Sequence, residues 1–361
     1  MDDTKTIDMT NTTHTTDKTP APETLSQRFA TLKSAEPKLR IRDAALRLGV
    51  TEAQLVALGC GAKNVRLNPD PQAFFHAAME LGRVMALTRN DHAVHERKGP
   101  YTEPGFFGPM GQVAGKDIDL RLFLNHWKIA FAVNENDRRS LQFFDAAGHA
   151  VHKLYLEEES DASAFERFVE NQRDENQSTS QSVEPVEAAK TDLPDDEIDR
   201  AGLVAGWRSL QDTHEFHSLL KKHKVGRRQA LRLAEPEFAV PVDPTTTGER
   251  LLHAAAASEV PIMVFVGNHG CIQIHTGPVQ KIVRFGDWIN VLDEDFNLHL
   301  RDTALSHAWV VRKPTKDGTV TSVELFDQPG NLVVQFFGAR KPGKPELEEW
   351  RTITAHLEVA P

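Results

Sequence analysis

Hydrophobic positions near the start of the chain repeat with a helical period. Leu25, Phe29 and Leu32 fall at i, i+4 and i+7, so one face of a helix there would be apolar. The next stretch, IRDAALRLGVTEAQLVALG, keeps this period on both sides of Gly49, and Thr51 is a typical N-cap residue. We expect one helix and then two short helices joined at Gly49.

The pattern changes after each helical region to short apolar runs of the kind found in strands. Examples are IMVFVG, GCIQIHTG and WVVRK, which are separated by Gly-containing turns. In the second half, residues 210–234 again have a helical pattern before the strands begin. Helices followed by runs of strands predict an α+β fold with large, mainly antiparallel sheets.

Three blocks of sequence occur twice, in the same order. The matching pairs are 140–148 with 322–330, 88–100 with 266–278, and 119–124 with 295–300. The period is far too long for a solenoid of short stacked repeats. We therefore expect a tandem duplication of two similar units, each with N-terminal helices followed by a large sheet.

Two segments lack the apolar residues that a core requires. Residues 1–23 are rich in Thr and Asp, and we expect a disordered tail there. Residues 171–200 contain many acids together with Ser, Gln and Asn, which predicts an acidic linker. The duplicated units would then be residues 24–170 and 201–361.

Charge and cysteine content narrow the function. The 361 residues have a formal net charge of −10, so we expect no binding to a nucleic-acid backbone. Cys60 and Cys271 are the only cysteines, which indicates a reducing cytoplasm rather than a disulfide framework. The N-terminus has no apolar signal-peptide core, and no apolar run reaches 18 residues, so we expect no membrane insertion.

The sequence gives little support for three common functional motifs: a zinc-protease motif, a DNA-binding helix–turn–helix and a dinucleotide-binding motif. HEFH, residues 214–217, places its histidines at i and i+3, whereas zinc proteases use HExxH, and no third ligand is evident. The pattern Ile41–Leu55 resembles a helix–turn–helix DNA reader, but the acidic charge and the strands that follow favour helices packed on a sheet. No GxGxxG motif follows a strand, so no flavin or nicotinamide site is predicted.

The segment DTHEFHSLLKKHKVGRRQALRLA combines three histidines with a run of cations. On a helix, the apolar stripe that contains Phe216 and Leu220 also contains His223, which predicts a structural role for that histidine. His214 and His217 lie on a different face. They are either solvated or part of a ligand site, because a neutral imidazole is a common ligand of metals and of haem iron.

A second candidate is DLRLFLNHW. Strand alternation places its three leucines on one face and Arg121, Phe123 and Asn125 on the other. This cation and aromatic ring either form an exposed edge or line a site for a flat, anionic, aromatic ligand. The segments VRKPTKDG and QFFGARKPGK add basic residues to the set: Lys313, Lys316 and Arg340.

These segments, together with IMVFVGNHGCIQIHTGPV, DWINVLDEDFNLHLR and RKPTKDGTVTSVELFD, resemble the HemS/ChuS/PhuS family. Its members are cytoplasmic haem-binding, haem-degrading and haem-trafficking proteins of bacterial haem-uptake systems. The resemblance extends from about Leu25 to the end of the chain, apart from the acidic linker. It implies two α+β units with haem held between the halves.

The resemblance also implies a site for haem b, bound as a ligand and degraded as a substrate in the enzymatic version. It matches His214 to the axial iron ligand and Arg121 to a distal arginine, which would also be the catalytic residue. The remaining matches lie beside the haem, contact its propionates or line its site: Phe123, Arg227, Lys313, Gln335, Phe337 and Arg340.

Two positions depart from the family pattern. Phe337 stands where some relatives have Tyr, so one hydroxyl donor is missing. His217 is a histidine that part of the family lacks, and members that have it resemble a haem-trafficking subtype. Our hypothesis is that His217 is an alternative iron ligand that allows haem to be handed on.

The resemblance leaves two functions open. The protein would accept imported haem and either degrade it to release iron or deliver it to a haem oxygenase; the alternative is a haem chaperone or store without turnover. The implied partners are a haem oxygenase, the inner-membrane haem transporter and, for an enzyme, an external reductase. A nucleic-acid-binding regulator rests on the Ile41–Leu55 pattern alone.

Overall fold

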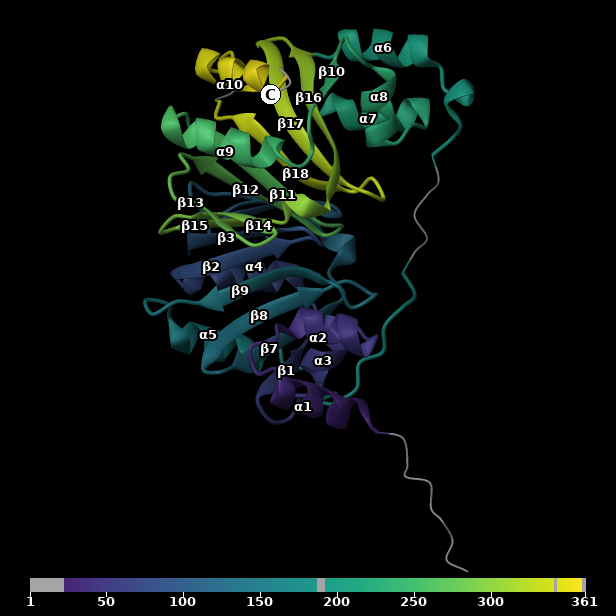
Figure 1. Ribbon diagram of the computed structural model, residues 1–361. Helices are drawn as coiled ribbons and strands as arrows, with labels where there is room; N and C mark the ends of the chain where they lie inside the picture. The colour runs from purple at the N-terminus through teal and green to yellow at the C-terminus, as the bar shows by residue number, and fades with distance from the viewer. Residues whose placement is uncertain (1–22, 187–191, 341–342, 359–361) are drawn as a thin grey trace, which may run out of the picture. The chain divides into compact units, whose positions relative to one another are not determined.

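The computed structural model describes residues 23–186, 192–340 and 343–358 (Figure 1). The chain divides into two compact units, one ending at Val50 and the other beginning at Thr51. None of the described helices is both long enough and apolar enough to cross a membrane.

The first unit contains the two helices α1 (Leu25–Ala35) and α2 (Ile41–Leu48). The guanidinium of Arg28 donates to the carbonyl of Leu48 at 2.8 Å, which ties the helices together. α2 ends at Gly49, whose φ of 67° is left-handed and free of strain only for glycine. The expected disordered tail, residues 1–23, lies outside the described residues except for Glu23.

The second unit contains two antiparallel sheets of nine strands. In spatial order, sheet A is β1 (Asn64–Leu67), β7 (Ile129–Glu135), β8 (Arg138–Phe144), β9 (Ala150–Leu156), β2 (Arg83–Arg89), β3 (Ala93–Pro100), β15 (Phe296–Leu300), β14 (Trp288–Leu292) and β13 (Ile282–Phe285). Sheet B is β10 (Ala239–Pro241), β16 (Leu305–Thr315), β17 (Gly318–Asp327), β18 (Leu332–Gly338), β11 (Ile262–Gly267), β12 (Cys271–Gly277), β6 (Asp119–Phe123), β5 (Met110–Ala114) and β4 (Pro104–Phe107).

The two halves of the chain exchange strands. Strands β4–β6 of the first half complete sheet B by pairing with β12, and strands β13–β15 of the second half complete sheet A by pairing with β3. The α+β class and the duplication are thus confirmed, but each sheet is assembled from both halves.

The strand register corrects one of the three sequence matches. Leu120 pairs with Gln273 and Leu298 pairs with His95, and these two partners are equivalent in the matched blocks of β3 and β12. The counterpart of Leu120 is therefore Leu298, two residues beyond the Phe296 that the match of 119–124 with 295–300 requires. A shift of two residues keeps every side chain on the same face, so alternation alone could not detect it.

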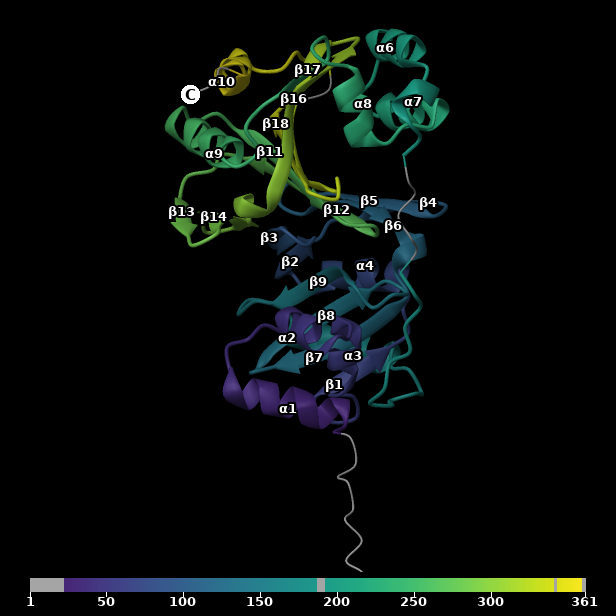
Figure 2. The same cartoon turned by 45° about the vertical axis from the view of Figure 1, so that its right-hand side comes forward.

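Helices cover the sheets unequally. On one face of sheet B, α9 (Thr247–Ala257) and α10 (Glu348–Glu358) bury a core with the strands. On the other face, α6 (Arg200–Arg208), α7 (Glu215–His223) and α8 (Arg227–Leu233) pack on β16 and β17 (Figure 2). Sheet A packs with α4 (Pro71–Glu80) and α5 (Ala162–Asn171) on one face, while α3 (Glu52–Ala57) lies against β1 and β7.

In the part that the structure describes, the predicted acidic linker is largely extended and bonds to sheet A. The guanidinium of Arg66 in β1 donates to the carbonyls of Ser178 and Ser180 at 3.0 and 2.9 Å. The backbone of Arg66 also bonds the side chain of Gln177 in both directions, at 3.0 and 2.9 Å. Hydrogen bonds to Arg66 thus hold residues 177–180, whereas near the other end of the predicted linker Ile198 is buried in the core with α6, α7 and α8. Residues 187–191 lie outside the described part.

Candidate functional site

His214 lies at the N-terminal end of α7, and 91% of its side chain is exposed. The loop before it is fixed in two ways. The carboxylate of Glu215 accepts from the backbone N–H of Gln211 at 2.8 Å, and the carbonyl of Gln211 accepts from the backbone N–H of Lys316 at 3.0 Å. Lys316 is in the turn between β16 and β17, so this hairpin positions the loop that presents His214.

Asp212 orients the imidazole of His214. One carboxylate oxygen lies 2.8 Å from the backbone nitrogen of His214 and 2.6 Å from its Nδ1. The backbone N–H and then the ring lower the pKa of Asp212, and the charge of Arg340 acts in the same direction. An ionised Asp212 accepts the proton on Nδ1, so the lone pair of the neutral ring is on Nε2. Histidines that bind metals are commonly held in this way.

The other two histidines of this segment have different surroundings. His217 is exposed, one turn along α7. His223 is half-buried, and its Nε2 is buried against α6 without a hydrogen-bond partner. The apolar stripe of α7 is buried as predicted, with Phe216 2% and Leu220 8% exposed.

A buried ion cluster lies beneath α7 and α8. The carboxylate of Glu324 accepts from Nε and Nη2 of Arg227 at 2.7 and 2.8 Å and from Nζ of Lys313 at 2.8 Å. The hydroxyl of Ser322 donates to the same carboxylate at 3.0 Å. The ring of Phe216 lies 5.2 Å from the guanidinium carbon of Arg227 and 4.8 Å from Nζ of Lys313, which connects this cluster to α7.

The charges in this cluster do not balance. Glu324 is fully buried and Lys313 is 3% exposed, whereas the side chain of Arg227 is 30% exposed. Burial alone would raise the pKa of Glu324, but Arg227 and Lys313 hold that pKa far below its usual range. Burial also lowers the pKa of Lys313, and the charge of Glu324 opposes this. Two cations and one carboxylate leave one positive charge, and a further anion would stabilise it.

Gln335 and Phe337 of β18 lie beside this cluster. Gln335 pairs with Glu324, and Phe337 pairs with Ser322 across the β17–β18 ladder, so their side chains share one face of sheet B. On β11, the next strand, Phe265 lies opposite Gln335, and its ring centroid is 5.0 Å from that of Phe337.

Arg121 and Phe123 are on the same face, three strands from β18. Arg121 pairs with Ile272 of β12, is half-exposed, and forms an ion pair with Asp119. Its Nη1 also donates to the carbonyl of Leu120 at 3.0 Å. The expected strand is shorter than predicted: it ends at Phe123, and Leu124–His126 form a 3-10 turn, so the alternation does not extend to Asn125.

A row of half-buried apolar side chains joins these residues on sheet B. It consists of Met263, Phe265, Ile272 and Phe337. The strand register assigns the corresponding row of sheet A to Met85, Leu87, Val94 and Tyr155. There Met85, Leu87 and Val94 are 3%, 9% and 3% exposed. Arg138 lies over the ring of Tyr155 at 4.3 Å, and its Nη2 is 3.5 Å from the sulfur of Met85. No described residue is shown to lie over the sheet B row in this way.

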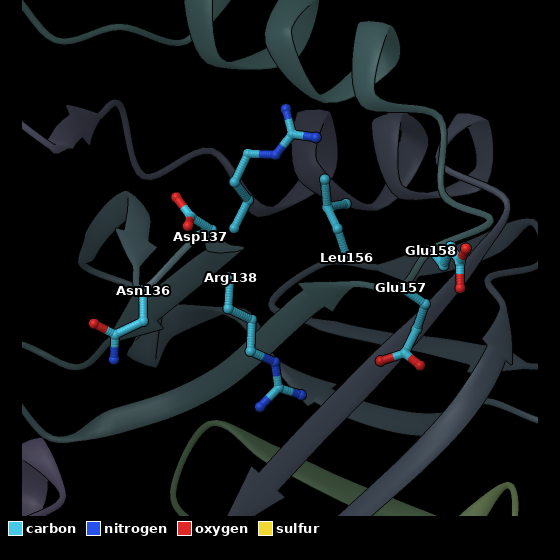
Figure 3. A pocket seen from close by; sticks show the side chains of 7 residues that line it. Asn136, Asp137, Arg138, Leu156, Glu157 and Glu158 are labelled. Atoms are coloured by element: carbon cyan, nitrogen blue, oxygen red, sulfur yellow. The ribbon is translucent and has the colours of Figure 1, made fainter. Parts of the chain in front are cut away.

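A hollow of about 310 Å³ lies at the edge of the sheet A face. Figure 3 shows the side chains that line it. The β7–β8 turn and the end of β9 line it, through Asn136, Asp137, Arg138, Arg139, Leu156, Glu157 and Glu158. Its lining is mostly charged, and Glu157 forms an ion pair of 2.9 Å with Lys98. None of the residues predicted from the sequence lies there, so this hollow and the sheet B face are separate features.

Sequence reasoning missed Asp212 and Glu324. The role of Asp212 could have been predicted from the sequence. An Asp side chain often accepts a hydrogen bond from the backbone N–H two residues later, which here belongs to His214. Glu324 also had a signal in the sequence, because it is an acid between the apolar residues Val323 and Leu325 of a strand, on the same side as Ser322. The partners of Glu324 could not be deduced, because Arg227 is 97 residues away in the chain.

Comparison with known proteins gives a consistent assignment. The model of the "Haemin-degrading HemS.ChuX domain" matches the chain twice, at residues 49–172 and 224–357. The two matches agree with the duplication. His214 and His217 lie between the matched segments, so this comparison does not bear on them.

Individual relatives cover nearly the whole chain. The hemin transport protein HmuS of Yersinia pestis is 39% identical over 346 residues, which are 92% of this chain and 97% of HmuS. Apo-PhuS, a haem-binding protein from Pseudomonas aeruginosa, is similar with a TM-score of 0.88 and 51% identity, over 91% of this chain and 97% of PhuS. ChuS, an E. coli haem oxygenase, has a TM-score of 0.81 and 34% identity, over 91% of this chain and 98% of ChuS.

Proposed function

Since this chain belongs to the HemS family of haemin-degrading proteins, we propose that it binds haem as its cargo in a bacterial haem-uptake system. The cargo would be iron protoporphyrin IX, a flat apolar ring with two carboxylates and a central iron. The protein would act in the cytoplasm.

The observation that carries this proposal is the uncovered apolar row on sheet B. Phe265 and Phe337 are half-buried on the face that also bears Arg121 and the buried ion cluster. Large apolar side chains that remain accessible beside charged groups are typical of ligand sites. The equivalent row of sheet A is covered, so the fold does not itself require an open face.

Each residue of the proposed site has a role that its chemistry supports. His214 would bind the iron through Nε2, with Asp212 holding the other nitrogen. Arg227, Lys313 and Arg340 would neutralise the carboxylates through charge-assisted hydrogen bonds. The haem ring would be lined by three further residues. Phe337 would contact it directly, Gln335 would lie beside it near the ion cluster of Glu324, and Phe123 would lie beside it near Arg121.

Two outcomes for the bound haem follow from the relatives, since HmuS is a transport protein and ChuS is a haem oxygenase. In the first, this chain delivers haem from an inner-membrane transporter to a haem oxygenase. In the second, it degrades haem with electrons from an external reductase. Arg121 supports the second outcome, degradation of haem by this chain. Its half-exposed guanidinium on the proposed haem face can hydrogen-bond a bound water or oxygen.

The binding site is tested by His214→Ala. We expect haem affinity to fall by more than about tenfold, because even residues that only support a metal ligand contribute that much. The measurement is a haem titration followed by the Soret band. His253→Ala is the matched control, since His253 is also an exposed helical histidine, on α9. Equal affinities of His214→Ala and wild type would contradict the proposed site.

The same titration tests His217 as an alternative ligand. His214→Ala should retain a residual histidine-ligated spectrum, which the additional change His217→Ala should abolish. Complete loss of histidine ligation in the single variant would exclude His217 as a substitute.

Turnover is tested separately by giving the haem-loaded protein a reductant and air, with catalase present. A Soret band that decays and releases iron supports degradation by this chain. A stable band with transfer to an added haem oxygenase supports delivery instead.

A further inference from the structure

The carboxylate of Glu324 binds the same two cations that an anionic ligand of this face would use. Arg227 directs Nε and Nη2 to it, and Lys313 directs Nζ to it, at 2.7 to 2.8 Å. Lys313 is 3% exposed, so little of its side chain is open to a ligand while it is bonded to Glu324. The outer edge of Arg227 remains accessible, because its side chain is 30% exposed.

The fold itself does not require an acid at this position. Gln142 is the equivalent residue of the first half, since it stands two residues after Ser140 as Glu324 stands after Ser322. Gln142 is 4% exposed, and its amide donates to Ser140 at 3.0 Å. An amide is therefore accommodated at the same place in the same sheet framework, with the same serine beside it.

We propose that Glu324 is an internal competitor for the carboxylates of haem and sets the rate at which haem leaves. In the absence of haem, Glu324 holds Arg227 and Lys313 on the ligand face and satisfies their hydrogen bonds. When haem is bound, its carboxylates share these cations with Glu324. When haem leaves, Glu324 takes both cations back, which stabilises the empty state and favours release to an acceptor. This inference rests on the proposed haem site.

The alternative role for Glu324 is purely structural, and it predicts the opposite result. If Glu324 only positions the cations, its loss misplaces them and haem leaves faster. If Glu324 competes, its loss frees them and haem leaves more slowly. The sign of the change in dissociation rate therefore distinguishes the two roles.

The experiment measures haem transfer from the loaded full-length protein to excess apomyoglobin. We expect Glu324→Gln to transfer haem about tenfold more slowly than wild type, since the charge-assisted hydrogen bonds returned to the ligand are of that size. Haem should also raise the thermal unfolding temperature of this variant more than that of wild type. An unchanged or faster transfer would overturn the proposal.

Glu346→Gln is the matched control. Glu346 is a buried carboxylate of the same half that bonds Arg351 and Thr321, and the side chain of Thr321 points to the opposite face of sheet B from Ser322 and Glu324. Its change should leave the transfer rate as in wild type. A slower transfer in this variant as well would assign the effect to general loss of a buried acid and overturn the role of Glu324.

A second background keeps the test decisive if Glu324→Gln does not fold. Lys313→Met removes one cation, so adding Glu324→Gln leaves Arg227 alone, with the same net charge as the wild-type cluster. The double variant should transfer haem more slowly than Lys313→Met alone. The opposite order would overturn the proposal, whereas a wild-type protein that binds no haem would contradict the haem site itself.

Discussion

The corresponding faces of the two sheets have the same framework but opposite exposure. On sheet A, Met85 and Leu87 are buried and Arg138 contacts Met85, while on sheet B the equivalent Met263 and Phe265 are half-buried. The counterpart of Arg138 is Val320, which is too short to lie over its neighbours. The loss of this long cation is one difference between the more closed face and the more open one.

The buried ion clusters on the two faces also differ, in their net charge. Lys153 and Glu52 form a buried pair on sheet A, each 7% exposed, and their charges cancel. The sheet B cluster of Arg227, Lys313 and Glu324 retains one positive charge. The unbalanced charge of the buried sheet B cluster is costly until an anion arrives. Duplication thus preserved the sheets, and a few side chains distinguish the two faces.

Acid is the treatment with the largest expected effect, and it should act on both halves alike. Burial lowers the pKa of His152 in β9 to about 3 and that of His275 in β12 to about 4. Both histidines are neutral in the fold but gain a proton near pH 6.5 when unfolded. Their stabilisation is complete above pH 6.5 and is lost as pH falls through 4 and 3, by several kcal/mol in total.

The measurement is the free energy of urea unfolding between pH 8 and 4, for wild type and for His152→Gln and His275→Gln. Each variant should show a weaker dependence on pH. A weaker dependence in only one of them would show that acid acts on a single half.

The next largest expected effect is on stability, and it differs between variants of the two buried lysines, Lys153 and Lys313. Lys153→Met removes one partner of the buried carboxylate of Glu52 and should cost about 3 kcal/mol of unfolding free energy. Lys313→Met leaves the neutral pair Arg227–Glu324, so its cost should be within about 1 kcal/mol, while haem affinity falls. Urea unfolding and haem titration of both variants test this. Equal losses of stability would refute the charge imbalance on which the comparison rests.

A smaller effect is expected when one side chain is truncated in each of the two apolar rows, and the rows should differ in which property changes. Leu87→Ala should cost about 2–3 kcal/mol of stability and leave haem binding unchanged, because this side chain is in the core. Phe265→Ala, at the equivalent position, should cost only about 1 kcal/mol because its ring is half-exposed. It should instead weaken haem binding. Comparable effects of the two variants on haem affinity would mean that the sheet B row is not the ligand face.

Much of the local structure could be predicted from the sequence. The hairpin of β8 and β9, the hairpin of β17 and β18, and the buried stripe of α7 agree with the alternation and the helical period. The two-residue error in matching β6 with β15 arose because alternation repeats every two residues. The offset between the halves also changes along the chain, since the β16–β17 hairpin extends two residue pairs further toward its turn than β7–β8 does. This extra length carries Lys316, which fixes the loop before His214.

The candidate site could be predicted in part. The resemblance selected residues of sheet B, and Arg121, Lys313, Gln335 and Phe337 do share one face. Their exposure could not be predicted. Lys313 and Arg121 are both cations in strands, yet one is buried in an ion cluster and the other is half-exposed. The difference depends on neighbours from other strands and helices.

The α+β class, the duplication, the β8–β9 and β17–β18 hairpins and the family could all be predicted from the sequence. They depend on periodicity, turn residues and matched blocks, which are properties of short stretches of chain. The exchange of strands between the halves, the binding of both Arg227 and Lys313 by Glu324 and the partial exposure of the sheet B face became evident from the tertiary structure alone. Strand partners and exposed fractions depend on contacts between residues that are far apart in the chain, and side-chain patterns carry no record of which distant strand will pair.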